Sequence, residues 1–280
     1  MNRKSILIVG VILLIIGSVS AYEIWKVHKP SSLFWHNGFK YAQANTINLN
    51  STMKAFPSDE SKVNAIHIDA TNSDIVVTTG AKFEINLTYY SPKQSEKVLS
   101  VSFKSDTLTI KQNNTVNDQT IFSLGEPASK ITIVIPDKSP IKSVYASNQY
   151  GNLTFKNLNQ IPSISANNEN GIITFNTVSA TSANISAQNE DMLMYRVTFD
   201  QATFQNISGD IEVEDSKILL GGKIINQTGD IYIKDTGLPP YYLMTTNGDK
   251  EISREQIANK TTKARADLCI RNETGDISIN

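Results

Sequence analysis

The sequence predicts an all-β protein: a β-solenoid of stacked coils of about 20 residues with an N-terminal β-hairpin cap and one N-terminal transmembrane helix. Three observations predict it. A short phrase of Asn, a turn residue and alternating apolar residues recurs from Tyr145 to Asp235. A second alternating run precedes each phrase, and an uncharged apolar run lies near the N-terminus. Strict alternation indicates strands with one buried face, and recurrence indicates that these strands stack.

Residues 1–25 predict a signal anchor. Arg3 and Lys4 are followed by an apolar run over 5–21 that contains no charged residue, and this run can cross a bilayer or serve as a signal-peptide core. An uncleaved anchor is favoured over a cleaved signal peptide because 22–25 is typical of an interfacial anchor. The basic end predicts a cytoplasmic N-terminus, so we expect a single-pass cell-membrane protein with its C-terminal domain extracytoplasmic.

Residues 26–61 are predicted to form a juxtamembrane stalk. The segment contains Phe34, Trp35, Phe39 and Tyr41 among basic and turn-forming residues. These aromatic rings either lie at the membrane surface or pack on the first strands of the following domain. Both alternatives stay open from the sequence.

Residues 62–280 are predicted to be one extracytoplasmic β-solenoid, in which 62–136 are capping strands and 137–280 are repeat rungs. A repeat stack needs a cap because its terminal coil would otherwise expose an unpaired edge. Alternating segments predict strands in the capping part at 63–70, 74–79, 83–90, 98–103, 107–111 and 131–136.

The rungs are predicted to turn at Gly151, Gly171, Asp191, Gly209 and Gly229, with inward residues two and four positions later. Gly permits the positive φ of a sharp turn and Asn tolerates it, so the abundant Asn residues are interpreted as corner residues. The expected inward pairs are Leu153/Phe155, Ile173/Phe175, Leu193/Tyr195, Ile211/Val213 and Ile231/Ile233, with further copies after Ser73 and Gly275 and a poor copy after Gly248.

The upstream runs place inward residues seven and five positions before each turn. The copy before Asp191 breaks this spacing, since Ile185 and Ala187 come one residue late, which predicts a β-bulge. A third apolar point follows each turn, at Leu158, Val178 and either Val197 or Phe199. The charged insertion 251–266 predicts a short helix. The expected upstream pairs are Ile66/Ile68, Val144/Ala146, Ile164/Ala166, Ala202/Phe204, Tyr241/Leu243 and Leu268/Ile270.

Composition limits the class of partner. Excluding Arg3 and Lys4 from the 26 basic residues leaves 24, against 27 acidic residues, so we expect no nucleic-acid partner. The single cysteine, Cys269, excludes an internal disulfide, which fits a bacterial surface. Alternation turns its neighbours inward, so Cys269 is expected to face outward, under the insertion 251–266.

The sequence assigns no catalytic, cofactor-binding or metal-binding residue. Asp210, Asp230, Asp249 and Asp276 recur at the turn position, either as solvated turn residues or as a calcium ladder. Solvated residues are favoured because the calcium-binding nonapeptide pattern is absent. No nucleophile elbow, Walker loop or zinc spacing occurs, and the three histidines, His28, His36 and His67, have no metal-ligand spacing.

The succession 131–136, 141–144 and the repeated Gly-Asp-Ile rungs resembles the bacterial β-strand-repeat putative adhesins, a domain family of unknown function. The resemblance implies a membrane-anchored protein similar to accessory proteins of envelope-stress operons in Gram-positive bacteria, and it implies no catalytic residue. We therefore expect a non-enzymatic adhesin or cell-envelope scaffold whose partner is a cell-wall or surface polymer or a membrane protein. The alternatives are an accessory component of envelope-stress signalling and a polysaccharide-acting β-helix enzyme.

Overall fold

The computed structural model contains two compact units. The smaller comprises residues 1–45, 89–95 and 116–127, and the larger comprises 46–88, 96–115 and 128–280. The structure describes residues 14, 17–19, 22, 32–35, 39–41, 43–48, 62–91, 99–112, 119–123, 129–257 and 259–280.

The smaller unit contains a three-stranded antiparallel sheet. Its central strand β1 (Ser32–Trp35) pairs with β2 (Phe39–Tyr41) and with β8 (Gln119–Ser123). The segment expected to be a stalk therefore contributes strands wherever it is described. Most of the expected signal anchor, 1–25, lies outside the described residues. Among the residues that are described, no helix combines the length and the apolar character that a membrane crossing requires.

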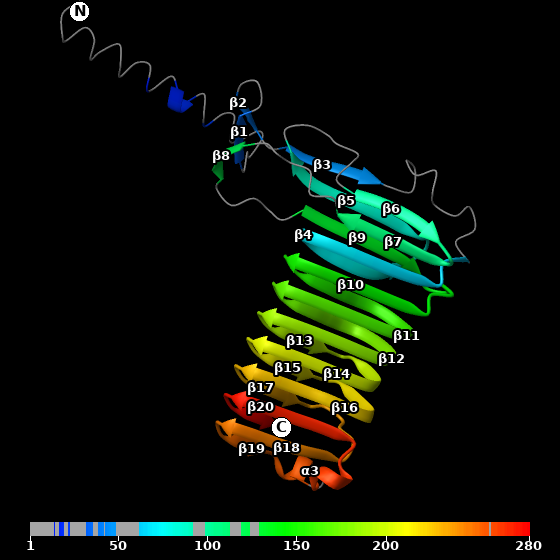
Figure 1. The fold of residues 1–280 in the computed structure, drawn as a ribbon, viewed down its shortest axis with the longest axis vertical. Coiled ribbons are helices and arrows are strands. Elements are labelled where there is room, and N and C mark those ends of the chain that lie inside the picture. Colours follow the sequence, from blue (N-terminus) through cyan, green and yellow to red (C-terminus); the bar gives the residue numbers. More distant parts are fainter. Residues whose placement is uncertain are drawn as a thin grey trace, which may run out of the picture. The chain divides into compact units, whose positions relative to one another are not determined.

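The larger unit is built almost entirely of strands (Figure 1). From Ala65 onward, its described helices are α3 (Arg254–Ile257) and the 3-10 helix η3 (Lys263–Arg265), so the short helix expected within 251–266 is confirmed. The remaining strands of the chain are β3 (Gln43–Asn48), β4 (Ala65–Gly80), β5 (Glu84–Ser91), β6 (Leu99–Lys104), β7 (Thr107–Gln112), β9 (Ser129–Pro136), β10 (Ser143–Tyr150), β11 (Leu153–Asn170), β12 (Ile173–Asn189), β13 (Met192–Tyr195), β14 (Thr198–Ser208), β15 (Ile211–Glu214), β16 (Lys217–Thr228), β17 (Ile231–Lys234), β18 (Tyr241–Asn247), β19 (Lys250–Ile252), β20 (Leu268–Thr274) and β21 (Ile277–Ile279).

Each complete coil has three sides. In one coil, side A is 163–170, before the glycine corner; side B is 173–176, after it; and side C is 178–180. Parallel pairing joins the same side of neighbouring coils, so that Ile164 pairs with Ala183, Ile173 with Met192 and Ala180 with Phe199. Figure 1 shows these strands lying parallel, one below the other. The predicted solenoid of stacked coils is confirmed.

The core is a continuous column of inward side chains from all three sides. Ile164, Ile173, Phe175 and Val178 each have at most 1% of their surface exposed. Both residues offered as the third inward position of this coil, Val197 and Phe199, are buried. The inward pairs predicted around Ser73, Gly151, Gly171, Gly209, Gly229 and Gly275 are also buried, as are all the predicted upstream pairs.

The prediction for the Asp191 copy was wrong by one residue. Met192 and Met194 are fully buried, whereas Leu193 and Tyr195 are partly exposed on the outer side. Ile173 pairs with Met192, so Glu190 takes the position that Gly171 and Gly209 occupy in neighbouring coils. Counted from Glu190, the residues seven and five positions earlier are Ala183 and Ile185, which are both buried, and Ala187 takes the position of Asn168. This coil is one residue shorter than its neighbour. The ladder from 182 to 189 is correspondingly unshifted, so the predicted bulge is absent there.

Most of the phrase-leading asparagines are core residues and do not form the corner themselves. Asn168, 0% exposed, donates its side-chain amide to the carbonyl oxygens of Gly151 (2.9 Å) and Gly171 (2.7 Å). These amides satisfy carbonyls that the glycine corners leave unpaired in the interior. The interpretation of Asn as a corner residue was therefore wrong for this column, which contains Asn148, Asn168, Asn206, Asn226 and Asn272.

Two kinds of corner bend each coil. The glycine corner has positive φ, 118° at Gly229, and a Cβ built there would lie 2.3 Å from the carbonyl oxygen of Gly209. The second corner, between sides B and C, uses left-handed residues other than glycine, with φ between 48° and 58° at Asn157, Thr177, Arg196, Asp215 and Asp235.

Gly229→Ala is expected to lower the free energy of unfolding by about 2–4 kcal/mol, because it combines an unfavourable φ with overpacking against the next coil. Chemical denaturation with matched m-values measures the loss. Gly237→Ala is the control, since its φ is not positive and its Cβ would lie 3.6 Å from the nearest atom, the side chain of Lys217. Equal stability of the two variants would contradict the proposed steric role of the corner.

The coils do not stack in chain order at the C-terminal end. Strand β20 pairs with β16 on one side and with β18 on the other, and β21 likewise lies between β17 and β19. The last residues of the sequence thus form the penultimate coil, and 241–252 forms the terminal one (Figure 1).

Both ends of the stack carry distinct closing elements. At the N-terminal end β6 and β7 form an antiparallel hairpin, and β5 pairs antiparallel with β9, which confirms the hairpin cap. β4 belongs to the stack itself, since it pairs with β10 and β11. At the other end the fully buried Tyr241 donates its hydroxyl to the carbonyl of Gln256 in α3 (3.0 Å), so the insertion covers the last core layer.

Candidate interaction surface

The corner carboxylates are bonded to the backbone of the next coil. Oδ1 of Asp210 accepts the amide of Asp230 at 2.7 Å, and Oδ1 of Asp230 accepts the amide of Asp276 at 2.7 Å. Asp191 and Asp276 make the same contact, to Asp210 and Asp249 respectively, both at 2.8 Å. These residues are therefore more than solvated turn residues, because one oxygen of each is an acceptor that links two coils.

Potential metal ligands lie apart from one another in the described part of the chain. Over the part of the chain that the structure describes, no group of three or more His, Cys, Asp or Glu side chains converges on a metal-sized space. His67 is exposed on side A and stacks on Tyr145, with ring centroids 4.6 Å apart. His28 and His36 lie outside the described residues. Cys269 is half-buried and faces outward, level with Lys223 and Tyr242, which confirms its predicted direction.

The outward residues of side B form what we call the side wall. It contains the residues that the sequence places on the outer face, Thr154, Thr174, Glu212 and Tyr232, with Leu193 completing the column between Thr174 and Glu212. A second column beside it comprises Lys156, Asn176, Tyr195, Glu214 and Lys234.

Polar groups of the side wall bond largely to one another. Lys234 Nζ lies 2.6 Å from Glu214 Oε1, and this contact raises the pKa of Lys234. The Tyr195 hydroxyl donates to Glu212 at 3.0 Å, and burial together with this bond raises the pKa of Tyr195 to about 12. Tyr232 donates to Asp230 at 2.7 Å, which is the main reason that its pKa rises to about 12. These contacts leave fewer free donors and acceptors for a partner.

The two raised pKa values predict a loss of stability in alkali. The folded state keeps both phenols protonated longer than the unfolded chain, whose tyrosines titrate near 10, so stability falls as pH rises from about 10 to about 12. Phenolate absorbance measures the titration. Subtracting the curve of Tyr232→Phe from that of the native chain is expected to isolate one phenol that titrates near pH 12. A difference curve centred near pH 10 would contradict the Tyr232–Asp230 bond.

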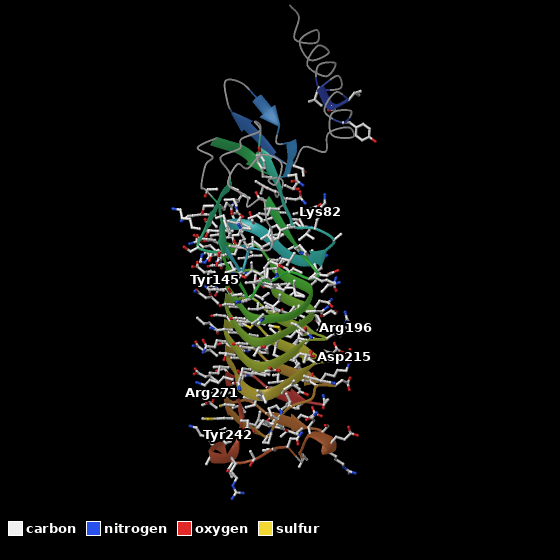
Figure 2. All side chains as sticks on the ribbon, turned by 90° about the vertical axis from the view of Figure 1, so that its right-hand side faces the viewer. Lys82, Tyr145, Arg196, Asp215, Tyr242 and Arg271 are labelled. Carbon is white, nitrogen blue, oxygen red and sulfur yellow. The ribbon has the colours of Figure 1, made fainter. Side chains whose placement is uncertain are left out.

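The outward residues of side A form a second surface, which we call the front wall. It is wider than the side wall, because its strands carry three outward positions each, at 163, 165 and 167 in the coil described above. Figure 2 shows Tyr145, Arg271 and Tyr242 projecting from the side of the larger unit that carries these strands, whereas Arg196 and Asp215 project from the opposite side.

A shallow pocket of about 290 Å³ lies between side C and the C-terminal insertion. Ile218, Leu219 and Leu238 give it an apolar wall, and Gln256 gives it a polar one. None of the eight described residues that line it is a carboxylate. It thus supplies no acid and base pair of the kind that glycoside hydrolysis uses.

The fold and these walls define a class: a parallel, three-sided β-solenoid that presents flat surfaces to solvent. Residues 63–280 match the family model described as Toastrack DUF4097. The chain therefore belongs to the Toastrack DUF4097 family, which confirms the resemblance drawn from the sequence.

Three solved structures are similar to this chain, and the first of them agrees with it at the level of the fold. A putative adhesin of Bacteroides fragilis NCTC 9343 is 13% identical with a TM-score of 0.52, over 85% of this chain and 97% of that one. A putative adhesin of Parabacteroides merdae ATCC 43184 is 12% identical with a TM-score of 0.47, over 84% and 95%. A putative lipid binding protein of Parabacteroides distasonis ATCC 8503 is 12% identical with a TM-score of 0.45, over 85% and 97%. No curated protein matches.

Proposed function

We propose that this chain is a membrane-anchored surface protein that holds its β-solenoid outside the cell and binds a cell-wall or surface polymer without catalysing a reaction. The observation that carries the proposal is the lateral register of the coils. Equivalent outward residues of successive coils pair directly, as Thr154 does with Thr174 and Glu212 with Tyr232. A wall with a fixed repeat suits a partner that is itself a repeating polymer, because many weak contacts add along its length.

The corner carboxylates support a binding role over a hydrolytic one. A hydrolase needs an acid and a base that are free to exchange protons with substrate. Asp210, Asp230 and Asp276 instead bond to backbone amides of the neighbouring coil, at 2.7 to 2.8 Å. The Bacteroides fragilis protein that shares this fold is described as a putative adhesin, which also supports a binding role for this chain.

The anchoring part of the proposal rests on residues 1–25. Arg3 and Lys4 precede an uncharged apolar run, an arrangement that keeps the N-terminus in the cytoplasm and places the solenoid outside. The test uses the full chain expressed in a Gram-positive bacterium. Protease added to intact protoplasts is expected to digest the solenoid, whereas a cytoplasmic control protein survives. Survival of the solenoid until the cells are lysed would overturn the extracytoplasmic location.

The binding part is tested by co-sedimentation. Full-length protein in detergent micelles is mixed with insoluble cell wall from the expressing bacterium, with wall stripped of its anionic polymers, and with an unrelated insoluble glucan. We expect the protein to pellet with at least one of these and to be released by the corresponding soluble fragment. Protein that stays in the supernatant with all three materials overturns the proposed function.

A further inference from the structure

The central part of the front wall is a grid without charge. Four neighbouring side A strands, from β10 to β14, present three outward residues each, and parallel pairing holds them level. None of the twelve is ionisable near neutral pH, in a chain in which 19% of residues are charged. The grid consists of Ser143, Tyr145, Ser147, Ser163, Ser165, Asn167, Ser182, Asn184, Ser186, Gln201, Thr203 and Gln205.

The polar groups of the grid are also free of hydrogen bonds to other protein groups in the described chain. None of the twelve side chains makes a hydrogen bond or an ion pair to the rest of the described chain. All are at least partly exposed to solvent, and the most exposed are Ser163, Ser182, Asn184, Gln201 and Gln205. This differs from the side wall, where Glu212, Glu214 and Tyr232 are bonded to neighbours. The grid therefore offers paired donors and acceptors that only water satisfies.

The chemistry of the grid selects a partner. Hydroxyl and amide side chains both donate and accept, which matches the hydroxyl groups of a sugar. An anionic polymer or an acidic lipid surface needs cations, and none lies within the grid; the cations around it are Lys142, Lys223, Lys111 and Arg271. A protein partner needs an apolar or aromatic interface core, and Tyr145 is the single aromatic residue of the grid. An uncharged polysaccharide is the class that remains.

Aromatic rings stand at one end of the grid. Tyr145 and His67 stack with centroids 4.6 Å apart and an interplanar angle of 25°, and both side chains face solvent at least in part. A pair of rings held in this way is a rigid apolar platform with polar edges. Such a platform suits a sugar ring, which has an apolar face and a hydroxyl rim.

We infer that the grid is a binding surface for an uncharged polysaccharide that lies across β10, β11, β12 and β14, with one sugar residue on the His67–Tyr145 platform. The inference rests on the proposed function, which requires only that some polymer binds, and it names the polymer class and the wall. Successive strands are about 4.8 Å apart, so a longer chain makes more contacts and binds more tightly.

The experiment uses full-length protein in micelles and affinity electrophoresis through gels that contain dextran, a linear β-glucan, mannan, anionic alginate or no polymer. Asn184→Lys places a charge in the grid. Thr174→Lys is its matched control, because both residues face outward on the same strand, β12, but Thr174 belongs to the side wall. Tyr145→Ala removes the platform, and circular dichroism checks that each variant is folded.

The inference expects retardation by at least one neutral polymer, about tenfold weaker binding by Asn184→Lys and Tyr145→Ala, and unchanged binding by Thr174→Lys. Retardation by alginate alone overturns the inference but leaves the proposed function standing. Binding that is abolished by Thr174→Lys and preserved by Asn184→Lys also overturns the inference and leaves the proposed function standing. Failure to bind these polymers together with failure to bind cell wall overturns both.

Discussion

Removal of residues 268–280 is expected to unfold the whole C-terminal end of the stack. These residues form the coil that lies between 217–234 and 241–252. Their inward side chains are fully buried, and burial of four large aliphatic residues contributes roughly 6–12 kcal/mol. The four are Leu268, Ile270, Ile277 and Ile279.

Hydrogen exchange on the truncated chain measures this effect. Amides of β18 and β19 are expected to lose all protection, because β20 and β21 are the strands with which they pair. Amides of β11 and β12, several coils away, are expected to keep theirs, since each coil contacts mainly its neighbours. Arg271→Ala is the control, because this side chain of β20 is 45% exposed. Retained protection in β18 of the truncated chain would refute the observed stacking order.

Phe175→Ala is expected to cost about 3–5 kcal/mol of unfolding free energy, the usual range for loss of a buried phenylalanine. Its ring stacks on Phe155 with centroids 4.5 Å apart and meets Phe199 edge to face at 6.1 Å. The cavity would therefore interrupt contacts between three successive coils. Urea denaturation measures the loss, and Phe175→Leu is expected to lose less because it leaves a smaller cavity. A loss below about 1 kcal/mol for the alanine variant would show that the aromatic column does not hold the coils together.

Much of the fold follows from local pattern. Alternation around Gly151 and Gly171 predicts the buried faces because a strand has a period of two, whatever lies beside it. The same reasoning failed at Asp191, where the coil lacks a glycine and is one residue shorter, so that Met192 and Met194 enter the core. The failure arose because the corner was identified by its residue type rather than by pairing.

The order in which the strands lie side by side is harder to predict from the sequence. Alternation says which face of β20 is apolar but does not say which strands flank it, so its place between β16 and β18 required the structure. The role of Asn168 and its equivalents was missed for a related reason. Alternation alone predicts that these asparagines point inward, because each lies two residues after a buried residue of the same strand, as Asn168 does after Ala166. The general preference of Asn for turns was given more weight.

The candidate surfaces were partly predictable. Side-wall residues such as Thr174 and Tyr232 were expected to face outward and they do. The charge-free grid was not recognised, because its twelve residues become neighbours only through pairing between strands about twenty residues apart. The signal that could have revealed it is the Ser- and Asn-rich outward set at 163–167 and 182–186.

The interleaved C-terminal coil has a consequence for biosynthesis. Residues 268–280 follow 241–252 in the chain, so strand β16 keeps an unpaired edge, and 241–252 has no neighbouring coil to pair with, until 268–280 have been synthesised. Unpaired edges of this kind invite wrong pairing between nascent chains. A fusion partner attached after Asn280 would leave the stack between two coils and not at its end. It would therefore hinder the pairing of 241–252 with 268–280.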